Sequence, residues 1–264
     1  MDLGIRGKVA VSSGGSKGMG RAISEDLARE GCKVVVVARG REAVDDTLAS
    51  IRAAGGEAIG VYADMASAEG ILQAQADARA AFGDPDIIIG NVYGPTHGRW
   101  ADTTDDDFLA AYEQIVMSQV RLLRTFTPAM KDKGWGRVVL INSISSKQPH
   151  RELPLVTANV TRVGALSLNK SVSDEIAKHG ITINTIGTGG FATDRYTEHM
   201  KRMTEENGQV YDAREAERRT EIPVGRLGRP DEMSAVVVFL CSERASYVTG
   251  QFIVVDGGKV EALY

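Results

Sequence analysis

The sequence has few cysteines and no long apolar run. Its two cysteines, Cys32 and Cys241, follow neither metal-ligand nor redox spacing, so we expect two buried thiols and no metal site. No apolar stretch reaches the roughly eighteen residues that a membrane helix needs, and no signal-peptide core follows the first residue. The formal net charge of −4 offers no basic surface for nucleic acid. We therefore expect a cytoplasmic protein without a nucleic-acid or membrane partner.

Short apolar runs of strand type alternate with helical patterns along the 264 residues. The expected strands cover residues 9–11, 33–38, 58–62, 87–89, 137–141, 181–186 and 252–255. The main expected helices cover residues 42–54, 106–131, 157–178 and 230–241. This alternation predicts an α/β fold with a doubly wound parallel sheet, formed as a single domain by residues 1–264. Residues 187–224 carry many charges, and we expect one or two mobile helices there that shape the substrate site.

A glycine-rich stretch follows the first expected strand and precedes a helical pattern. Gly14, Gly18 and Gly20 give the spacing Gly-x-x-x-Gly-x-Gly. Because glycine lacks a Cβ atom, the backbone turns tightly and approaches a ligand closely. The next helix offers free N–H groups at its N-terminus, which suit a pyrophosphate. The stretch therefore predicts a dinucleotide site, with the candidate cofactor-binding residues Ser13, Gly14, Ser16, Lys17, Gly18, Met19 and Gly20.

Arginine ends the second expected strand. Arg39 lies nineteen positions after Gly20, where dinucleotide folds place an acidic residue for the ribose of NAD or an arginine for the 2′-phosphate of NADP. Lys17 in the glycine-rich stretch is a second cation for that phosphate. We therefore expect NADP(H) as the cofactor.

Together these features resemble the classical short-chain dehydrogenase/reductase family, and the matches continue in family order to the end of the chain. Further matches are Asp64, Asn91, Asn184, Gly189 and Thr193, followed by the segments 228–230, 249–250 and 256–258. The resemblance implies a Rossmann fold of about seven strands, oxidoreductase activity on a small-molecule substrate, and commonly a homotetramer. It also places Asp64, Met65, Asn91, Gly189, Thr193 and Arg162 around the cofactor.

The catalytic residues of the family are matched only in part. The family uses Asn, Ser, Tyr and Lys, the last two spaced as Tyr-x-x-x-Lys, and this chain contains no such pair. Alignment along the helix 157–178 places Ala158 at the tyrosine position and Arg162 at the lysine position. Ile115 falls at the asparagine position, and Ser143 alone is retained. The chain therefore resembles a divergent branch, because Asn159 and Arg162 match its Ser-Asn-x-x-Arg segment.

The replacements change what the site can do. Ala158 has no ionisable group and cannot exchange a proton with a substrate. Arg162 can bond ribose hydroxyls with its fixed donors, but its pKa above about 12 makes it a poor proton donor. Ser143 can still steady a substrate carbonyl. The candidate catalytic residues are therefore Ser143, Arg162 and Asn159, with the proton delivered by another group.

Two residues rank first as replacement acids. Tyr93 follows the fourth expected strand, near the expected nicotinamide position, and His150 lies between Ser143 and the helix that carries Arg162. His97 and Tyr196 are weaker candidates, and we expect His179 and His199 on the surface.

Three functions compete. The first is an NADP(H)-dependent oxidoreductase that acts on a small carbonyl, imine or related substrate with non-standard proton delivery. The second is a non-redox lyase or hydrolase on the same fold, and the third is a non-catalytic NADP-binding partner subunit. Retention of Ser143 and Thr193 favours the first two. Apolar faces on helices 106–131 and 157–178 also predict a homo-oligomer, carried by Leu109, Tyr112, Val116, Val120, Val163, Leu166 and Val172.

Overall fold

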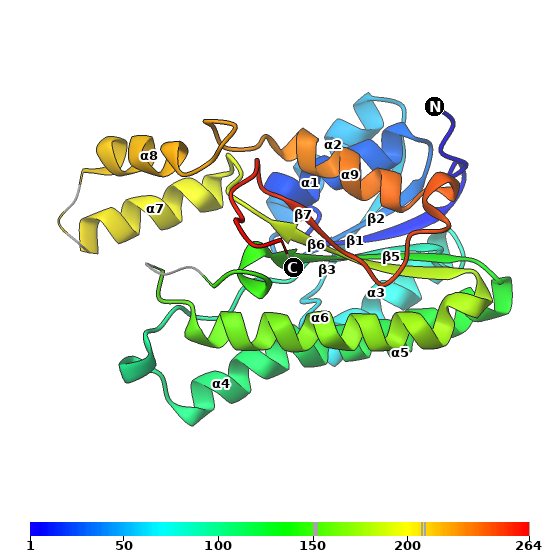
Figure 1. The fold of residues 1–264 in the computed structure, drawn as a ribbon. Helices are drawn as coiled ribbons and strands as arrows, with labels where there is room; N and C mark the ends of the chain where they lie inside the picture. Colours follow the sequence, from blue (N-terminus) through cyan, green and yellow to red (C-terminus); the bar gives the residue numbers. More distant parts are fainter. Residues whose placement is uncertain (150–152, 207, 209, 264) are drawn as a thin grey trace.

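The computed structural model describes residues 1–149, 153–206, 208 and 210–263. Seven strands form one sheet in the order β3-β2-β1-β4-β5-β6-β7, and every neighbouring pair is parallel (Figure 1). The strands are β1 (Val9–Ser13), β2 (Lys33–Ala38), β3 (Glu57–Tyr62), β4 (Ile87–Gly90), β5 (Gly136–Ser143), β6 (Ile181–Thr188) and β7 (Phe252–Val255). The doubly wound parallel sheet expected from the sequence is confirmed.

Side chains of the central strands alternate between two hydrophobic cores. In β2, Val34 and Val36 pack on one side of the sheet, and Val35 and Val37 pack on the other. Because successive strand residues face opposite sides and helices cover both faces, the strand is apolar throughout. One face is covered by α1 (Gly18–Arg29), α2 (Arg41–Ala53) and α9 (Pro230–Leu240), and the other by α3 (Ala68–Ala81), α5 (Ser118–Lys133) and α6 (Val156–Ile176) (Figure 1).

The helix expected over residues 106–131 is divided by a π-helical segment. It comprises α4 (Asp105–Tyr112), the π-helical residues Glu113–Met117, and α5. Within the π segment, the Gln114 side-chain amide donates a hydrogen bond of 2.7 Å to the Tyr93 carbonyl oxygen. Such segments are frequent at functional sites. Here the π segment ties the helical run to the loop that follows β4.

Several strands end later than the sequence predicts, and β5 and β6 are two of those with the largest extensions. We expected them to end at residues 141 and 186, but β5 continues to Ser143 and β6 to Thr188. Asn142 pairs with Gly187, and Ser143 pairs with Thr188, so the parallel register continues through polar residues. Ser143 is therefore the last residue of a strand rather than a loop residue.

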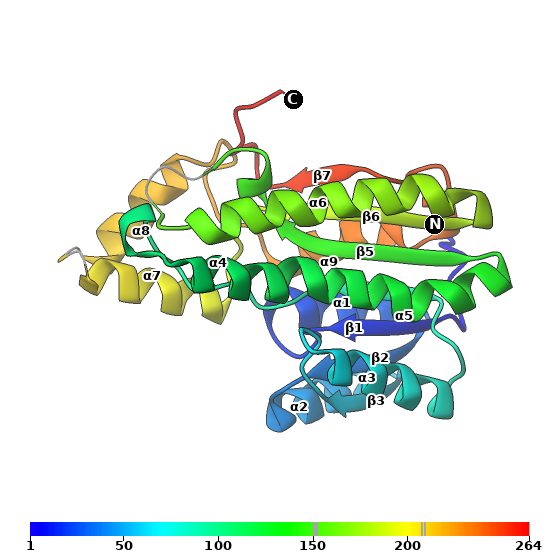
Figure 2. The ribbon, with the colours of Figure 1, turned by 90° about the horizontal axis from the view of Figure 1, so that it is seen from below.

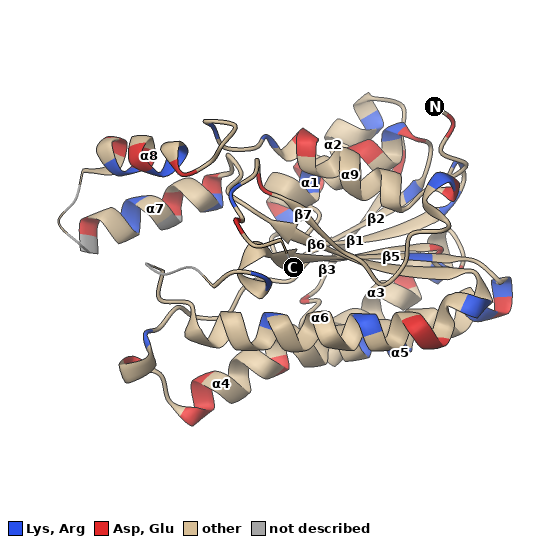
Figure 3. Cartoon of the chain, in the orientation of Figure 1, with Lys and Arg blue, Asp and Glu red and all other residues tan. Residues whose placement is uncertain are grey.

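Two helices follow β6 in the charged segment, as expected. They are α7 (Asp194–Glu206) and α8 (Tyr211–Thr220). Both lie beyond the carboxyl ends of the strands (Figure 2), and bands of both charges alternate along them (Figure 3). Met200, Arg218 and Ile222 are buried nonetheless, so one side of this helix pair packs against the protein.

Both cysteines are free and buried, as expected, although Cys241 follows the last residue of α9 instead of lying within it. Burial is the main cause that raises the pKa of Cys32 to about 12. Each helix in the described part of the chain is too short or too polar to span a membrane. The described His, Cys, Asp and Glu side chains form no group that could hold a metal ion.

Candidate functional site

The candidate cofactor groove opens where the strand order reverses, between β1 and β4. Ligands of open α/β sheets bind at such a switch point, outside the carboxyl ends of the strands. Gly14 and Gly18 have φ angles of 61° and 51°, which side chains rarely tolerate. A Cβ atom on Gly20 would lie 2.0 Å from the Gly14 carbonyl oxygen. The three glycines are therefore required by the backbone itself.

Hydrogen bonds hold the glycine-rich loop against the sheet. The Ser13 hydroxyl donates to the Asn91 carbonyl oxygen at 2.9 Å, which links the ends of β1 and β4. The buried Ser24 hydroxyl lies 2.8 Å from the Ser12 hydroxyl and 3.0 Å from the Gly20 carbonyl oxygen. Lys17 precedes α1 and does not cap it with its side chain. The first N–H groups of α1 therefore face the groove without a side-chain cap.

Arg39 is the candidate cation for the adenosine end of this groove. Arg39 follows β2 directly, its side chain is 66% exposed, and its guanidinium lies 3.8 Å from the Asp64 carboxylate. Such an exposed pair is weak, so Arg39 can turn toward a phosphate. Met65 is buried in the core, so only its backbone can face a ligand. Ser16 is also buried, and its carbonyl oxygen accepts from Thr47.

Residues from β6 and its following loop complete the groove. Thr193 packs on the glycine-rich loop, since a Cβ atom on Gly18 would lie 3.1 Å from the Thr193 methyl group. The Gly189 N–H donates to the Val255 carbonyl oxygen at 3.0 Å, which fixes the end of β6 against β7. Met19 packs against the core beside α9. The close glycine backbone, uncapped helix N–H groups and nearby cations fit a phosphorylated dinucleotide.

Asn142 organises the second part of the site. Its side-chain oxygen accepts from the Ser143 N–H at 2.7 Å, the Ser146 hydroxyl at 3.1 Å and the Arg162 guanidinium at 3.3 Å. Its side-chain amide donates to the Arg162 carbonyl oxygen at 3.1 Å. Asn142 is itself buried. It therefore joins the end of β5, the turn after it and α6 in one unit.

The helix α6 brings Ala158, Asn159 and Arg162 to this unit. Ala158 is 4% exposed and Ile115 on the π segment is 2% exposed, so both are packing residues. Burial, and secondarily the positive charge of Arg195, lowers the pKa of Arg162 to about 10. The side-chain oxygen of Asn159 is buried without a hydrogen-bond partner. Ser143 and Arg162 therefore lie on the same hydrogen-bonded unit.

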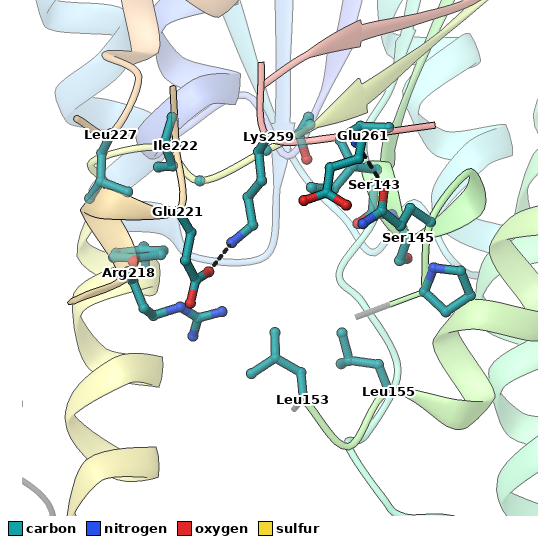
Figure 4. Close-up of a pocket in the computed structure, with 18 of the residues that line it drawn as sticks. Ser143, Ser145, Leu153, Leu155, Arg218, Glu221, Ile222, Leu227, Lys259 and Glu261 are labelled. Carbon is teal, nitrogen blue, oxygen red and sulfur yellow. Dashed lines mark hydrogen bonds and ion pairs between the residues drawn. The ribbon is translucent and has the colours of Figure 1, made fainter. Parts of the chain in front are cut away.

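A cavity of about 470 Å³ adjoins Ser143. Figure 4 shows apolar side chains on one part of its wall and an ion pair on another, where Lys259 lies 2.7 Å from Glu221. Lys259 belongs to the segment after β7, and the Glu261 N–H of that segment donates to the Gln148 side chain at 2.9 Å (Figure 4). The labelled lining residues also include Leu153, Leu155, Ile222, Leu227 and Arg218. The cavity suits a small ligand with polar groups.

The structure separates the candidate acids. Tyr93 is 57% exposed and does not line the cavity with Ser143; its ring instead lies 3.8 Å from the guanidinium carbon of Arg195. Tyr196 does line the cavity, and burial is the main cause that raises its pKa. His150 lies outside the described residues, as does the side chain of His199, whereas His97 forms a contact within the structure.

The sequence did not reveal several of the residues in this site. Asn142 follows an apolar strand and reads as the start of a loop, although a polar residue directly before Ser143 was a usable signal. Arg195 and Lys259 read as surface charges, because no local pattern shows what lies opposite them. Their positions depend on contacts between α7, β4 and the segment after β7.

Comparisons with known proteins agree with this geometry. A family model described as enoyl-(acyl carrier protein) reductase matches residues 14–259. Dehydrogenase/reductase SDR family member 4 of Oryctolagus cuniculus is 30% identical over 260 residues, covering 98% of this chain and 96% of the relative. The 3-oxoacyl-(acyl-carrier-protein) reductase of Salmonella typhimurium is 30% identical over 256 residues, with 97% and 98% covered. The structure of L-sorbose reductase from Gluconobacter frateurii, complexed with NADPH and L-sorbose, has a TM-score of 0.92 at 33% identity, with both chains covered fully.

Proposed function

Because this chain belongs to the short-chain dehydrogenase/reductase family, we propose that it is an NADP(H)-dependent reductase of a small carbonyl, imine or related substrate. Its proton delivery does not use a tyrosine of α6. One observation carries the proposal: Ser143 and Arg162 share the Asn142 unit beside the glycine groove, while Ala158 lies at the position that alignment assigns to the tyrosine. NADPH supplies a hydride when it is bound.

The groove residues support NADP(H) over NAD(H). Lys17 and Arg39 are the cations that the sequence assigns to the 2′-phosphate, and a charge-assisted contact with that phosphate is worth about 1.5–3 kcal/mol. The relative described above, L-sorbose reductase, is an NADPH complex. The N–H groups at the start of α1 hold the remaining phosphates, Thr193 contacts the nicotinamide carboxamide, and Arg162 bonds ribose hydroxyls in place of the family's lysine.

Ser143 has the hydrogen-bond arrangement of a donor to substrate. Its hydroxyl oxygen accepts from the Ser145 N–H at 3.1 Å, and its own hydrogen goes to no described partner. A serine hydroxyl that already accepts one bond donates its hydrogen in another direction. Here that direction is the cavity, so Ser143 steadies the substrate oxygen or nitrogen as negative charge develops on it.

The proton reaches the substrate from the cavity side. Among the described residues, Tyr196 is the tyrosine that lines this cavity with Ser143. Because burial raises its pKa, the phenol stays protonated at neutral pH and is available as a donor, directly or through water. An imine or activated alkene needs less assistance than an unactivated ketone, and we therefore rank these substrates first.

The proposal is tested with NADPH that carries deuterium at the transferred position. Purified protein is incubated with a panel of ketones, cyclic imines and conjugated enones, and products are examined by mass spectrometry. Incorporation of one deuterium is expected. Product formation without deuterium would contradict the redox assignment and favour a lyase or hydrolase.

Variants then assign the residues. Ser143→Ala should lower turnover by about a hundredfold or more while NADPH affinity stays unchanged. Tyr196→Phe should lower turnover and remove an ionisation from the pH profile. Ser171→Ala, an exposed serine on α6, is the control and should leave turnover unchanged. If Ser143→Ala keeps full activity, this corner is not where the reaction takes place.

A further inference from the structure

The segment that begins at Thr193 crosses the cofactor groove. At one end, Thr193 packs on Gly18 at the start of α1. Two residues later, the Arg195 guanidinium carbon lies 3.8 Å from the centre of the Tyr93 ring, on the loop after β4. Because β1 and β4 are neighbours in the sheet, this segment spans the space above their carboxyl ends. Arg195 thus reaches from α7 to the opposite wall of the groove.

A second guanidinium approaches the same place. A Cβ atom on Gly94 would lie 3.1 Å from an Arg162 terminal nitrogen and 3.4 Å from an Arg195 terminal nitrogen. The two cations therefore meet at one glycine, which leaves room for both. Among the described residues, no carboxylate lies within ion-pair distance of either arginine.

Two like charges held together without a counter-ion are unfavourable unless an anion binds between or beside them. The Tyr93 ring compensates Arg195 only in part, because a cation–π contact at an exposed site is worth about 0.5–1 kcal/mol. A phosphate or carboxylate would accept hydrogen bonds from the planar fork of each guanidinium. The pair is therefore suited to an anionic ligand.

We propose that Arg195 is an anion-binding strap of the cofactor groove: it leaves the Tyr93 ring and binds the diphosphate of the dinucleotide, while Arg162 beside it bonds the adjoining ribose. The inference rests on the proposed function, since it requires that the groove binds NADP(H). The diphosphate is preferred to a substrate carboxylate because Thr193 holds the strap against the glycine-rich loop. Neither arginine lines the cavity that contains Ser143.

The test measures NADPH binding directly, in the absence of substrate. Wild type, Arg195→Gln and Arg195→Lys are titrated by isothermal calorimetry at two salt concentrations. Loss of the guanidinium should weaken NADPH binding by about tenfold to a hundredfold. Arg195→Lys should fall between the two, because a point charge replaces the fork. The salt dependence of binding should be smaller for Arg195→Gln than for wild type.

Lys201→Gln is the matched control, since it removes one positive charge from the exposed side of the same helix. Its NADPH affinity should equal that of wild type, and thermal unfolding checks that each variant is folded. Equal NADPH affinity of wild type and Arg195→Gln would overturn the proposal. A raised KM of Arg195→Gln for a carboxylate substrate, with unchanged NADPH binding, would also overturn the proposal and would assign the anion to the substrate. Failure of wild type to bind NADPH would remove the proposed function itself, and the two failures are therefore distinguishable.

Discussion

Replacement of Gly20 by alanine should displace the glycine-rich loop, because the added methyl group has no space. Its carbon would lie 2.0 Å from the Gly14 carbonyl oxygen and 3.2 Å from the Asn91 side-chain nitrogen, whereas ordinary contacts begin at 3.4 Å. The Gly14 atom belongs to the backbone, so no side-chain rotation relieves the overlap. Overpacking of this kind costs about 1–3 kcal/mol, and each kcal/mol lowers the melting temperature by about 2–4 °C in a chain of this size.

The same displacement should weaken NADPH binding at least tenfold, because the phosphates depend on the loop backbone. Thermal unfolding and NADPH titration measure the two effects separately. Gly164→Ala on α6 is the control, because the nearest neighbour of its added Cβ atom would be a Val116 methyl carbon at 3.7 Å, an ordinary contact distance. Alanine is favoured over glycine in a helix by about 0.5–1 kcal/mol, so this variant should melt slightly higher and bind NADPH normally. If Gly20→Ala matched wild type in both measurements, the loop packing described above would be refuted.

Three further predictions concern the cofactor, the missing tyrosine and assembly. Arg39→Ala should remove a preference of about tenfold to a hundredfold for NADPH over NADH in fluorescence titrations; equal affinity of wild type for both would show that the interpretation of Arg39 is wrong. Ala158→Tyr with Arg162→Lys should slow the native reaction despite adding a potential general acid, because a phenol would fill space at a buried position; faster turnover on the native substrate would indicate a decayed reductase. Leu109 and Val163, 66% and 47% exposed, predict a homo-oligomer, so light scattering should give a mass above 28.3 kDa, and a monomer at micromolar concentration would contradict this.

The fold was predictable because its signals are local. The β-branched run of β2 has the same apolar character on both faces, as a strand between two helical layers requires. Glycines at 14, 18 and 20 mark the first turn by their backbone needs alone. Strand ends were less predictable: Asn142 and Ser143 look like loop residues, yet their register with β6 holds them in the sheet. That pairing joins segments far apart in sequence and leaves no local pattern.

The apolar faces that predict a homo-oligomer are exposed only in part, for a similar reason. Leu109 and Tyr112 are exposed, as a face for a second copy requires. Val116, which has the same helical spacing, is 4% exposed and packs against Ala165 of α6 within the chain. Periodicity identifies an apolar stripe but not which part of it a neighbouring helix already covers.

The convergence of Arg195, Arg162 and Tyr93 was beyond the sequence because it joins α7, α6 and the loop after β4. On α7 an arginine among acidic and basic neighbours reads as a solvated face. The one local indication of this contact was Gly94, because the absence of a side chain there leaves room for both guanidinium groups. A glycine outside any recognised turn motif therefore carried information about a close approach.

The corner around Ala158 has the packing of a complete site. Ala158 is buried, Arg162 is bonded to Asn142, and the Ser143 hydroxyl is oriented by the Ser145 N–H. Loss of a phenol from a site built to hold one would leave a void, and voids in a packed interior are costly. The polar atoms without partners nearby are the Asn159 amide oxygen and the Ser145 hydroxyl, neither of which replaces a tyrosine as acid. Under the proposed function, the proton for the substrate then comes from the cavity, where burial raises the pKa of Tyr196 and so keeps its phenol protonated.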